Sequence, residues 1–428
     1  MTTSRSSNSV DRGRSRPFAH ALAAFATLAL AACGGGEGGG SGEFAGTMRD
    51  SAGIAIVDNP SEGLWTDADR WTLAEELRIG TNEGDPVYQF AAISGIAALP
   101  DGRIAILDGQ DQEFRIFSAE GEHLRTIGRA GSGPGEFGMG AGPILVAAGD
   151  TLLIPDLMNQ RINRYAPDGE PLGSVPMIWQ SGGMPMSWLD RSDGGVVTQL
   201  RPFALPGSDT PASGNDVLEL RGPDGMVHDT LMTFESGRTV DFSRGAEVTL
   251  FAPEPVWTLA GDRLVFGISD DFRLRVYRED GTLERIFTMP FTVRAVTEQD
   301  QAALIAVMVA VWEDFGLPPQ AVEMARQTIH FAESYPAFSQ IRGGPEGTIW
   351  VQDVMGISEM KAGDLENFAQ SPVGSPVWRV FDSEGVLLGE VRMPDRFQPL
   401  RFDGDRIFGV QRDEYDVQYA VALRLNRF

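Results

Sequence analysis

Short segments in which apolar and polar residues alternate recur along the chain, separated by Asp-Gly or Glu-Gly turns. The clearest unit spans 93–128 and contains four such segments, with turns at Gly102 and Gly121 after the first and third. Alternation with a period of two predicts a half-buried strand, and an Asp-Gly turn between two strands is a strong hairpin signal. The unit therefore predicts a sheet of four antiparallel strands.

Similar units fill most of the chain. Clear copies occupy 143–175 and 256–287, and weaker copies occupy 183–234, 336–393 and 395–428. Four-stranded antiparallel sheets that repeat along a chain are typical of β-propeller blades. The sequence thus predicts an all-β fold, a six-bladed β-propeller over 51–428. A β-sandwich is the alternative, but it does not explain a four-strand period.

The last unit, 395–428, has only three obvious strands, and we expect its fourth strand to come from the other end of the chain. Residues 77–80 parallel residues 125–128, because both segments end in Ile-Gly and are followed by a proline six residues later. The second of these segments closes the first blade, so the first segment should also be an outer strand. Residues 72–80 are therefore predicted to complete blade six and remove a sheet edge. The strand-like segment 52–57 has no place in this scheme.

Three insertions interrupt the repeat. Two lie between second and third strands, at 201–215 in blade three and 354–376 in blade five, and the third, 291–335, connects blades four and five. In a four-stranded blade, these loops and the blade connections emerge on the same face, which we call the long-loop face. Long loops on a rigid scaffold commonly bind ligands. An unknown protein or small-molecule ligand is therefore expected on this face.

The connection 291–335 predicts two helices, an apolar one over 302–312 and a second over 321–332. Eleven apolar residues are too few to span a bilayer. Two uses of this insertion stay open. The apolar helix packs against the propeller, or the insertion forms a lid or a partner-docking surface with Trp312 and Phe315, and both hold if the helix packs locally and leaves a rim exposed. A further alternative is that the chain is a subunit of an envelope assembly and uses these helices to bind its partners.

The N-terminal residues 1–32 have the pattern of an export signal, in which arginines precede an apolar stretch that is too short for a stable membrane span. This stretch ends in Leu30-Ala31-Ala32, directly before Cys33, the only cysteine of the chain. The arrangement resembles the lipobox of bacterial lipoproteins. That resemblance implies that Cys33 is lipidated and becomes the mature N-terminus. An ordinary secretory signal with an unmodified cysteine is the alternative.

Residues 33–50 then comprise the lipidated cysteine and a Gly-rich tether, which suits a domain that stands off a membrane. Gly34 rather than Asp follows the cysteine, and in the lipoproteins that the chain resembles this leaves sorting to the outer membrane open. We therefore expect a lipid anchor in the cell envelope, in the outer membrane rather than the inner one.

Composition excludes several classes of protein. The formal net charge is −25, with 35 Lys and Arg against 60 Asp and Glu. Nucleic acid is therefore not an expected partner, because phosphate binding needs a positive field. With 42% hydrophobic residues the chain can form a large core, so overall disorder is excluded. A single cysteine forms no disulfide within the chain, so the core must stabilise the fold. We expect a monomer.

Candidate catalytic groups are scarce in this sequence. The histidines that follow the signal, His123, His228 and His330, lack the spacing of metal ligands. Gly-x-Ser-x-Gly does not occur, and the Ser-x-x-Lys pair Ser358 and Lys361 lacks the companion motifs of a serine nucleophile. No catalytic residue is therefore predicted.

Aspartates recur at the ends of second strands, at Asp108, Asp156 and Asp353. Oxygen ligands that converge on a central channel suit Ca²⁺, so these three residues are candidate metal ligands and Ca²⁺ is the candidate cofactor. The alternative is structural: each carboxylate satisfies backbone N–H groups of its own loop.

Residues 128–137, followed by 156–162, look like an NHL-type repeat, and 72–428 resembles the six-bladed propeller lipoproteins of bacteria. The resemblance, the signal and the missing catalytic set favour a lipid-anchored, non-catalytic binding or scaffolding module without a cofactor. The alternative is a Ca²⁺-dependent hydrolase or lyase of the lactonase-like propeller kind. That alternative requires several carboxylates that point into the central channel.

Overall fold

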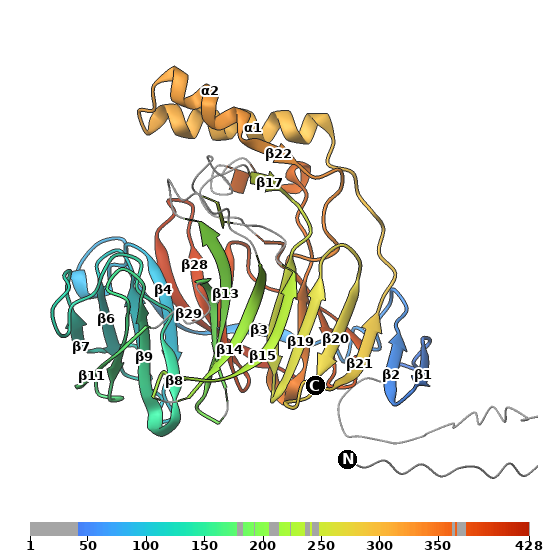
Figure 1. The fold of residues 1–428 in the computed structure, drawn as a ribbon, viewed down its shortest axis with the longest axis horizontal. Coiled ribbons are helices and arrows are strands. Elements are labelled where there is room, and N and C mark those ends of the chain that lie inside the picture. Colours follow the sequence, from blue (N-terminus) through green and yellow to red (C-terminus); the bar gives the residue numbers. More distant parts are fainter. Residues whose placement is uncertain are drawn as a thin grey trace, which may run out of the picture. The chain divides into compact units, whose positions relative to one another are not determined.

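The computed structural model contains a ring of β-sheets with a helical insertion (Figure 1). It describes residues 42–427 except 178–182, 192, 205–213, 223, 236–239, 242–247, 362–363 and 366–373. The lipobox residues Leu30, Ala31, Ala32 and Cys33 lie outside the described residues, so their predicted roles stay predictions.

The chain is a six-bladed β-propeller of four-stranded antiparallel blades. Blade one comprises β4 (Ile93–Ala98), β5 (Ile104–Asp108), β6 (Glu113–Phe117) and β7 (His123–Gly128). Blade two comprises β8 (Leu145–Ala147), β9 (Thr151–Asp156), β10 (Arg161–Tyr165) and β11 (Pro171–Pro176). Blade three comprises β12 (Gly183–Asp190), β13 (Val196–Ala204), β14 (Asn215–Arg221) and β15 (Val227–Glu235).

The other three blades follow the same order, and the predicted fold class is confirmed. Blade four comprises β18 (Pro255–Ala260), β19 (Arg263–Ile268), β20 (Arg273–Tyr277) and β21 (Leu283–Thr288). Blade five comprises β23 (Gln340–Gly343), β24 (Ile349–Gln352), β25 (Val377–Phe381) and β26 (Leu387–Arg392). Blade six comprises β27 (Phe397–Asp403), β28 (Arg406–Arg412), β29 (Gln418–Asn426) and β3 (Thr72–Ile79).

The ring is closed by the pairing of the two ends of the chain in blade six. β3 pairs antiparallel with β29, with Thr72 opposite Asn426 and Ile79 opposite Ala420. On the outer edge, Glu76 accepts hydrogen bonds from Arg406 at 2.9 Å and from Arg424 at 2.8 Å. The strand that precedes blade one in the sequence therefore supplies the outer strand of the last blade, and the edge of β29 is covered.

The segment 52–57, which the repeat pattern left without a place, belongs to a hairpin on blade four. β1 (Thr47–Ser51) and β2 (Ile54–Asp58) form this hairpin, and β2 pairs parallel with the outer strand β21. The sheet of blade four thus has six strands. The predicted tether, 33–50, ends earlier than expected because its last residues pair as β1.

The chain between this hairpin and β3 ties blade four to blades five and six. Asn59, which is buried, donates to the carbonyl oxygens of Thr288 at 3.1 Å and Gly385 at 2.9 Å, and it accepts from the amide of Leu387 at 2.7 Å. Further along, Trp71 packs beside Trp350 of blade five, with ring centroids 6.3 Å apart, and belongs to the same buried cluster as Ile407 and Val421 of blade six. One N-terminal segment therefore contacts three consecutive blades.

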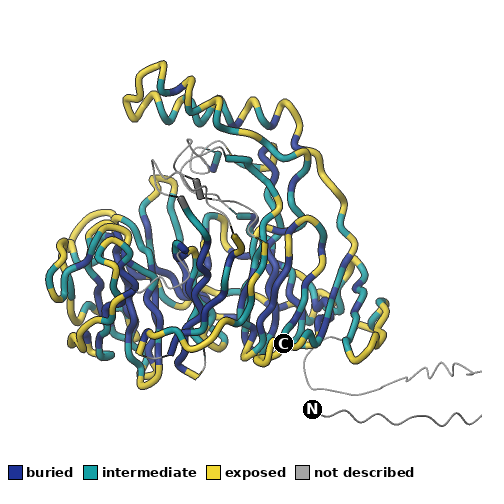
Figure 2. The backbone as a smooth tube through the Cα atoms, in the orientation of Figure 1, coloured by how far each residue is buried: buried dark blue, intermediate teal, exposed yellow. Residues whose placement is uncertain are grey.

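Apolar side chains fill the spaces between neighbouring blades. Figure 2 shows buried residues, in dark blue, along the strands of the ring. Phe272 and Phe287 of blade four pack against Phe381 of blade five. The other face of β25 presents Trp378 to Val421 and other apolar residues of blade six. Burial of each such side chain contributes about 2–3 kcal/mol, and this core holds the blades without disulfides.

The connection between blades four and five forms α1 (Glu298–Asp314) and α2 (Pro319–Gln327). A capping box between Thr297 and Asp300 starts α1. The second helix ends at Gln327 rather than Ala332, because β22 (Ile329–Phe331) pairs parallel with β17 (Val248–Leu250) instead. A short parallel pair also joins β16 (Val240–Asp241) to the end of β13. In the described part of the chain, no helix combines the length and apolar character needed to cross a membrane.

Replacing Asn59 with alanine should weaken the attachment of the N-terminal segment. The change leaves two buried carbonyls and one buried amide without their partner, so we expect the free energy of unfolding to fall by about 3 kcal/mol. Denaturant unfolding followed by tryptophan fluorescence measures this loss. Asp67→Ala, at a fully exposed side chain, is the control and should change stability by less than about 0.5 kcal/mol. Equal stability of the two variants would contradict the role of Asn59.

Candidate functional site

A pocket of about 970 Å³ opens on the long-loop face where blades four, five and six meet. Its walls come from the residues after β21, the blade-five insertion, strands β25 and β26 and the start of blade six. Two predicted insertions touch each other here, because α1 contacts the turn η4 (Ile357–Glu359) and the Tyr335 hydroxyl accepts a hydrogen bond from the amide of Ile357 at 3.0 Å. The departures from the four-strand repeat therefore build this pocket.

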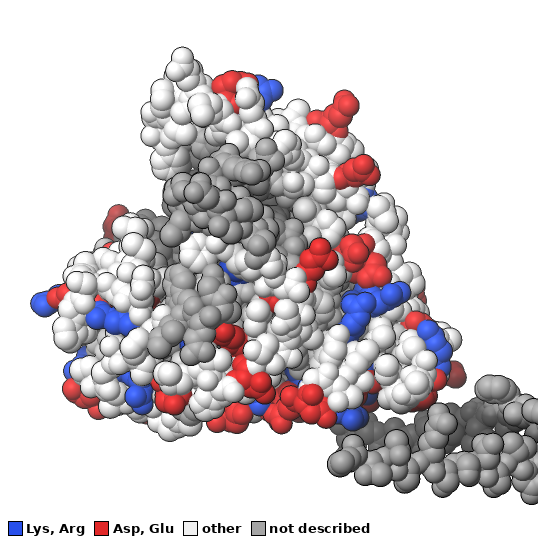
Figure 3. Space-filling model, viewed as in Figure 1, with Lys and Arg blue, Asp and Glu red and all other residues white. Residues whose placement is uncertain are grey.

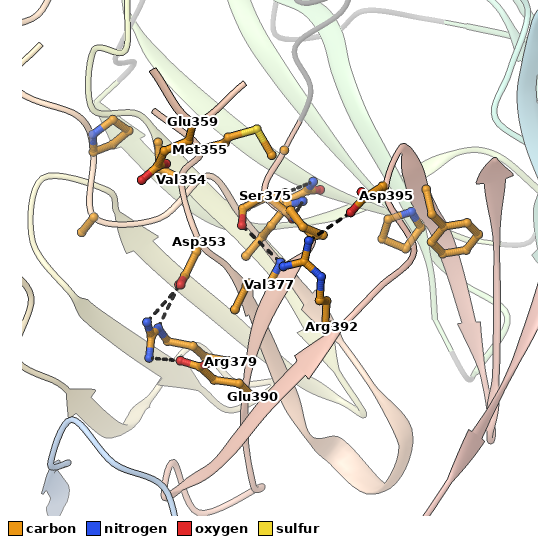
Figure 4. A pocket seen from close by; sticks show the side chains of 18 of the residues that line it. Asp353, Val354, Met355, Glu359, Ser375, Val377, Arg379, Glu390, Arg392 and Asp395 are labelled. Atoms are coloured by element: carbon orange, nitrogen blue, oxygen red, sulfur yellow. Dashed lines mark hydrogen bonds and ion pairs between the residues drawn. The ribbon is translucent and has the colours of Figure 1, made fainter. Parts of the chain in front are cut away.

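One wall of the pocket is the acidic triad, which consists of Asp353, Arg379 and Glu390 (Figure 4). Arg379 binds Asp353 through two parallel hydrogen bonds, at 2.8 and 3.0 Å, and its remaining terminal nitrogen lies 2.8 Å from a Glu390 oxygen. Arg379 on β25 stands directly opposite Glu390 on β26, and Asp353 follows β24. Antiparallel pairing thus places two carboxylates around one guanidinium, and the formal charge of the triad is −1.

A second wall is the basic triad, which consists of Lys361, Arg392 and Asp395. One oxygen of Asp395 lies 3.0 Å from the Lys361 ammonium, and the other lies 3.0 Å from a guanidinium nitrogen of Arg392. Lys361 comes from the blade-five insertion and is the only lysine of the chain. Here two cations share one carboxylate, and the formal charge of the triad is +1.

The other charged residues of the pocket form pairs of one cation with one anion. These pairs are Arg294 with Glu359, Arg396 with Asp364, and Arg412 with Asp416, at 2.8 to 2.9 Å. Apolar side chains line the space between the charged groups, among them Phe272, Met289, Phe291, Met355 and Val377. The pocket therefore offers both an apolar surface and charged groups of both signs.

The pKa values of Asp353 and Asp395 are shifted in opposite directions in the two triads. Burial raises the pKa of Asp353, and Arg379 only partly offsets this effect. The hydrogen bond from Lys361, together with Arg392, holds the pKa of Asp395 below its usual value. Protonation is thus easier in the acidic triad, where negative charge is in excess, than in the basic triad.

The candidate metal ligands Asp108 and Asp156 lie in blades one and two, each at the end of a second strand. The fully buried Asp108 accepts four backbone hydrogen bonds, from Ala91, Ala92, Gln110 and Asp111, at 2.7 to 3.1 Å. The Asp156 carboxylate accepts from the amides of Gly138 and Asn159 and from the Asn159 side chain. Both therefore hold loops, and the third candidate, Asp353, is bound to Arg379.

The structure does not bring these three aspartates together. Among the described residues, no group of three or more His, Cys, Asp or Glu side chains is close enough to hold a metal ion. The first strands of blades two to six instead surround a cavity of about 470 Å³ at the centre of the ring, and Arg342 and Arg401 line it. Arg401 pairs with Asp190 at 2.6 Å, while burial lowers the pKa of Arg342 to about 10. Asp150, Asp190, Asp193 and Arg191 line the same cavity, and Asp193 pairs with Arg191 at 3.0 Å.

The predicted partner-binding residues lie at the C-terminal end of α1. Phe315 is 69% exposed, whereas Trp312 is partly buried. The visible surface of the helical insertion carries few charged side chains (Figure 3). The role of Trp312 and Phe315 in binding a partner stays a prediction.

The triad residues Arg379, Glu390, Arg392 and Asp395 were not identified from the sequence. A sequence signal exists, since Glu390 and Arg392 alternate along the outer strand of blade five, next to its long insertion. Alternating charges on an outer strand are common at exposed surfaces, so this signal alone does not indicate a pocket.

Comparison with known proteins supports the fold. Residues 88–177 match a family model described as a 6-bladed beta-propeller, and a search of the curated proteins found no match. A solved member of the DUF4221 family from Bacteroides vulgatus is 11% identical; the alignment covers 84% of this chain and 98% of that one, with a TM-score of 0.50. At this identity the likeness concerns the fold alone.

Two further solved structures align over most of the chain. A putative exported protein from Bacteroides fragilis is 12% identical, with 87% of this chain and 100% of that one covered and a TM-score of 0.48. A catalytically inactive virginiamycin B lyase from Staphylococcus aureus is 11% identical, with 83% and 100% covered and a TM-score of 0.43.

Asp108→Asn tests the structural role of the recurrent aspartate. The amide replaces one acceptor oxygen by a donor that faces a backbone N–H, so we expect a loss of about 2 kcal/mol in the free energy of unfolding. We also expect the melting temperature of the unsubstituted protein to be the same in Ca²⁺ and in chelator. Asp67→Asn is the matched surface control. A stabilisation by Ca²⁺ that disappears in Asp108→Asn would instead support a metal site.

Proposed function

We propose that this protein is a lipid-anchored, non-catalytic binding module of the bacterial cell envelope, and that its ligand occupies the pocket between blades four, five and six. The observation that carries the proposal is the pocket itself. It lies where two insertions of the repeat meet, and its size is in the range of sites for small molecules.

The side chains of the pocket support binding rather than catalysis. Catalytic acids, bases and nucleophiles need a free proton-transfer position or an activating partner. Here each charged side chain of the pocket is engaged in an ion pair, and the single lysine shares Asp395 with Arg392. Because ion pairs already hold these side chains in place, they can recognise a charged ligand without a large rearrangement of the pocket.

A Ca²⁺-dependent hydrolase or lyase is less well supported by the described residues. Such an enzyme requires carboxylates that converge on a metal, but no group of three among the described residues is close enough to hold one, and Asp190 and Asp193 of the central cavity are paired with Arg401 and Arg191. Asp108 and Asp156 each accept hydrogen bonds from backbone amides of their own loop and of the preceding blade connection.

The lipid anchor rests on the sequence around Cys33, which resembles a lipobox and is followed by the Gly-rich tether. A diacylated cysteine gives stable membrane attachment where one acyl chain does not. The propeller would then be held at the membrane surface, in the outer membrane rather than the inner one, and exposed to ligands in the surrounding compartment.

Cys33→Ser tests the anchor. Serine has no thiol for acylation, so the variant should move from the membrane fraction to the soluble fraction when the full chain is expressed in a bacterium that processes lipoproteins. Cell fractionation and detergent phase partitioning measure the change. Gly34→Ala, which keeps the cysteine, should stay in the membrane. Membrane retention of Cys33→Ser at the wild-type level would contradict lipid anchoring.

Val377→Trp tests the pocket. We expect a screen of small molecules by thermal shift, performed on residues 33–428 with Cys33→Ser, to yield ligands whose stabilisation disappears when an indole blocks the space between the two triads. Bound ligands should also slow the modification of Lys361 by an amine-reactive reagent, which mass spectrometry can follow at one side chain because the chain has no other lysine. Leu172→Trp, on an exposed position of β11, is the control. Ligands that tolerate Val377→Trp would place binding elsewhere.

A further inference from the structure

The pocket is electrically neutral as a whole but divided by charge. The acidic triad holds Arg379 between Asp353 and Glu390, and the basic triad holds Asp395 between two cations. The remaining charged residues of the pocket are paired one to one. An excess negative charge and an excess positive charge therefore face the same space.

Strand geometry sets the distance between the two triads. Glu390 and Arg392 are two residues apart on β26, so their side chains project from the same face of the blade. Their opposite neighbours on β25 are Arg379 and Val377, respectively. Two residues of a strand span about 7 Å. Figure 4 shows Glu390 and Arg392 side by side, with Val377 between the two groups of charges.

Each triad retains hydrogen-bonding capacity for a ligand. Glu390 is half exposed, and its described contact with Arg379 uses one carboxylate oxygen. In the basic triad, Asp395 takes one bond each from Lys361 and Arg392, whose side chains are 77% and 64% exposed. An ammonium carries three donors and a guanidinium five, so most of these donors can face a ligand.

The geometry points to a specific class of ligand. We propose that this pocket binds a small zwitterion, with its ammonium group at the acidic triad and its carboxylate at the basic triad. An aliphatic chain between the two groups would lie along Val377 and the apolar lining residues Phe291 and Met355. This inference rests on the proposed function of the pocket and specifies the chemistry of its ligand.

Opposite charges on the two walls give selectivity against ligands with a single charge. A pure anion meets the carboxylates of Asp353 and Glu390, and a pure cation meets Lys361 and Arg392. Unfavourable contacts of this kind discriminate between ligands as strongly as favourable ones. A zwitterion of matching length satisfies both walls.

Calorimetric titration of residues 33–428 with Cys33→Ser tests this proposal. The probe is 6-aminohexanoate, whose extended chain separates its charges by a distance similar to two strand residues, and the comparison ligands are hexanoate and hexylammonium. We expect the zwitterion to bind at least about tenfold more tightly than either ligand with one charge, because it gains a second charge-assisted contact.

Two neighbouring substitutions separate the contributions of the walls. Glu390→Gln should bring the affinity for 6-aminohexanoate close to that for hexanoate, and Arg392→Gln should bring it close to that for hexylammonium. Both side chains are at least half exposed, so the fold should persist, and melting temperatures check this. Arg278→Gln, on an exposed side chain of blade four outside the pocket, should leave all three affinities unchanged.

The outcomes distinguish this inference from the proposed function. If 6-aminohexanoate does not bind, binds no more tightly than both single-charge ligands, or binds equally to Glu390→Gln and Arg392→Gln, the zwitterion proposal is wrong. The proposed binding pocket survives that result if hexanoate or another small molecule binds and Val377→Trp abolishes its binding. If Val377→Trp abolishes no binding, both proposals fail.

Discussion

The pairing of β3 with β29 is the interaction on which the rest of the structure depends. It joins residues from the two ends of the chain, with Thr72 opposite Asn426. Without it, β29 would expose an unpaired edge and blade six would have three strands. The N-terminal segment reaches this position after pairing along β21 and binding the backbone of blade five through Asn59. Closure therefore involves half of the ring and not one strand alone.

A closed ring also determines where irregular segments can go. The first strands of the blades crowd the central cavity, and the apolar faces between blades are filled. Extra residues in a blade must then leave through one of the two faces of the ring. The insertion between β24 and β25 and the connection after β21 leave through the same face, where η4 contacts α1. The pocket is a consequence of this shared exit, because each insertion forms a wall that the other completes.

Features that repeat could be predicted from the sequence, and features that depend on a single non-local contact could not. The Asp-Gly turns report local hairpins, so blade number and the closing strand 72–80 follow from periodicity. The hairpin of β1 and β2 joins blade four by a parallel pairing with β21, and no turn in the neighbouring sequence indicates this pairing. The aspartates at 108 and 156 illustrate another limit, since a carboxylate that recurs in a pattern serves backbone amides as readily as a metal.

The charge arrangement of the pocket depends both on the repeated strands and on single non-local contacts. Glu390 and Arg392 point to one side because a strand alternates, and Arg379 meets Glu390 because of the antiparallel register. Lys361 and Asp395 reach the same space from two loops, which no repeat specifies. The strands of the blade thus place Glu390 and Arg392 at a fixed spacing. The loop residues around them give the two walls opposite net charges. A propeller can therefore change its ligand by changing its loops while the strands that position the opposing charges stay the same.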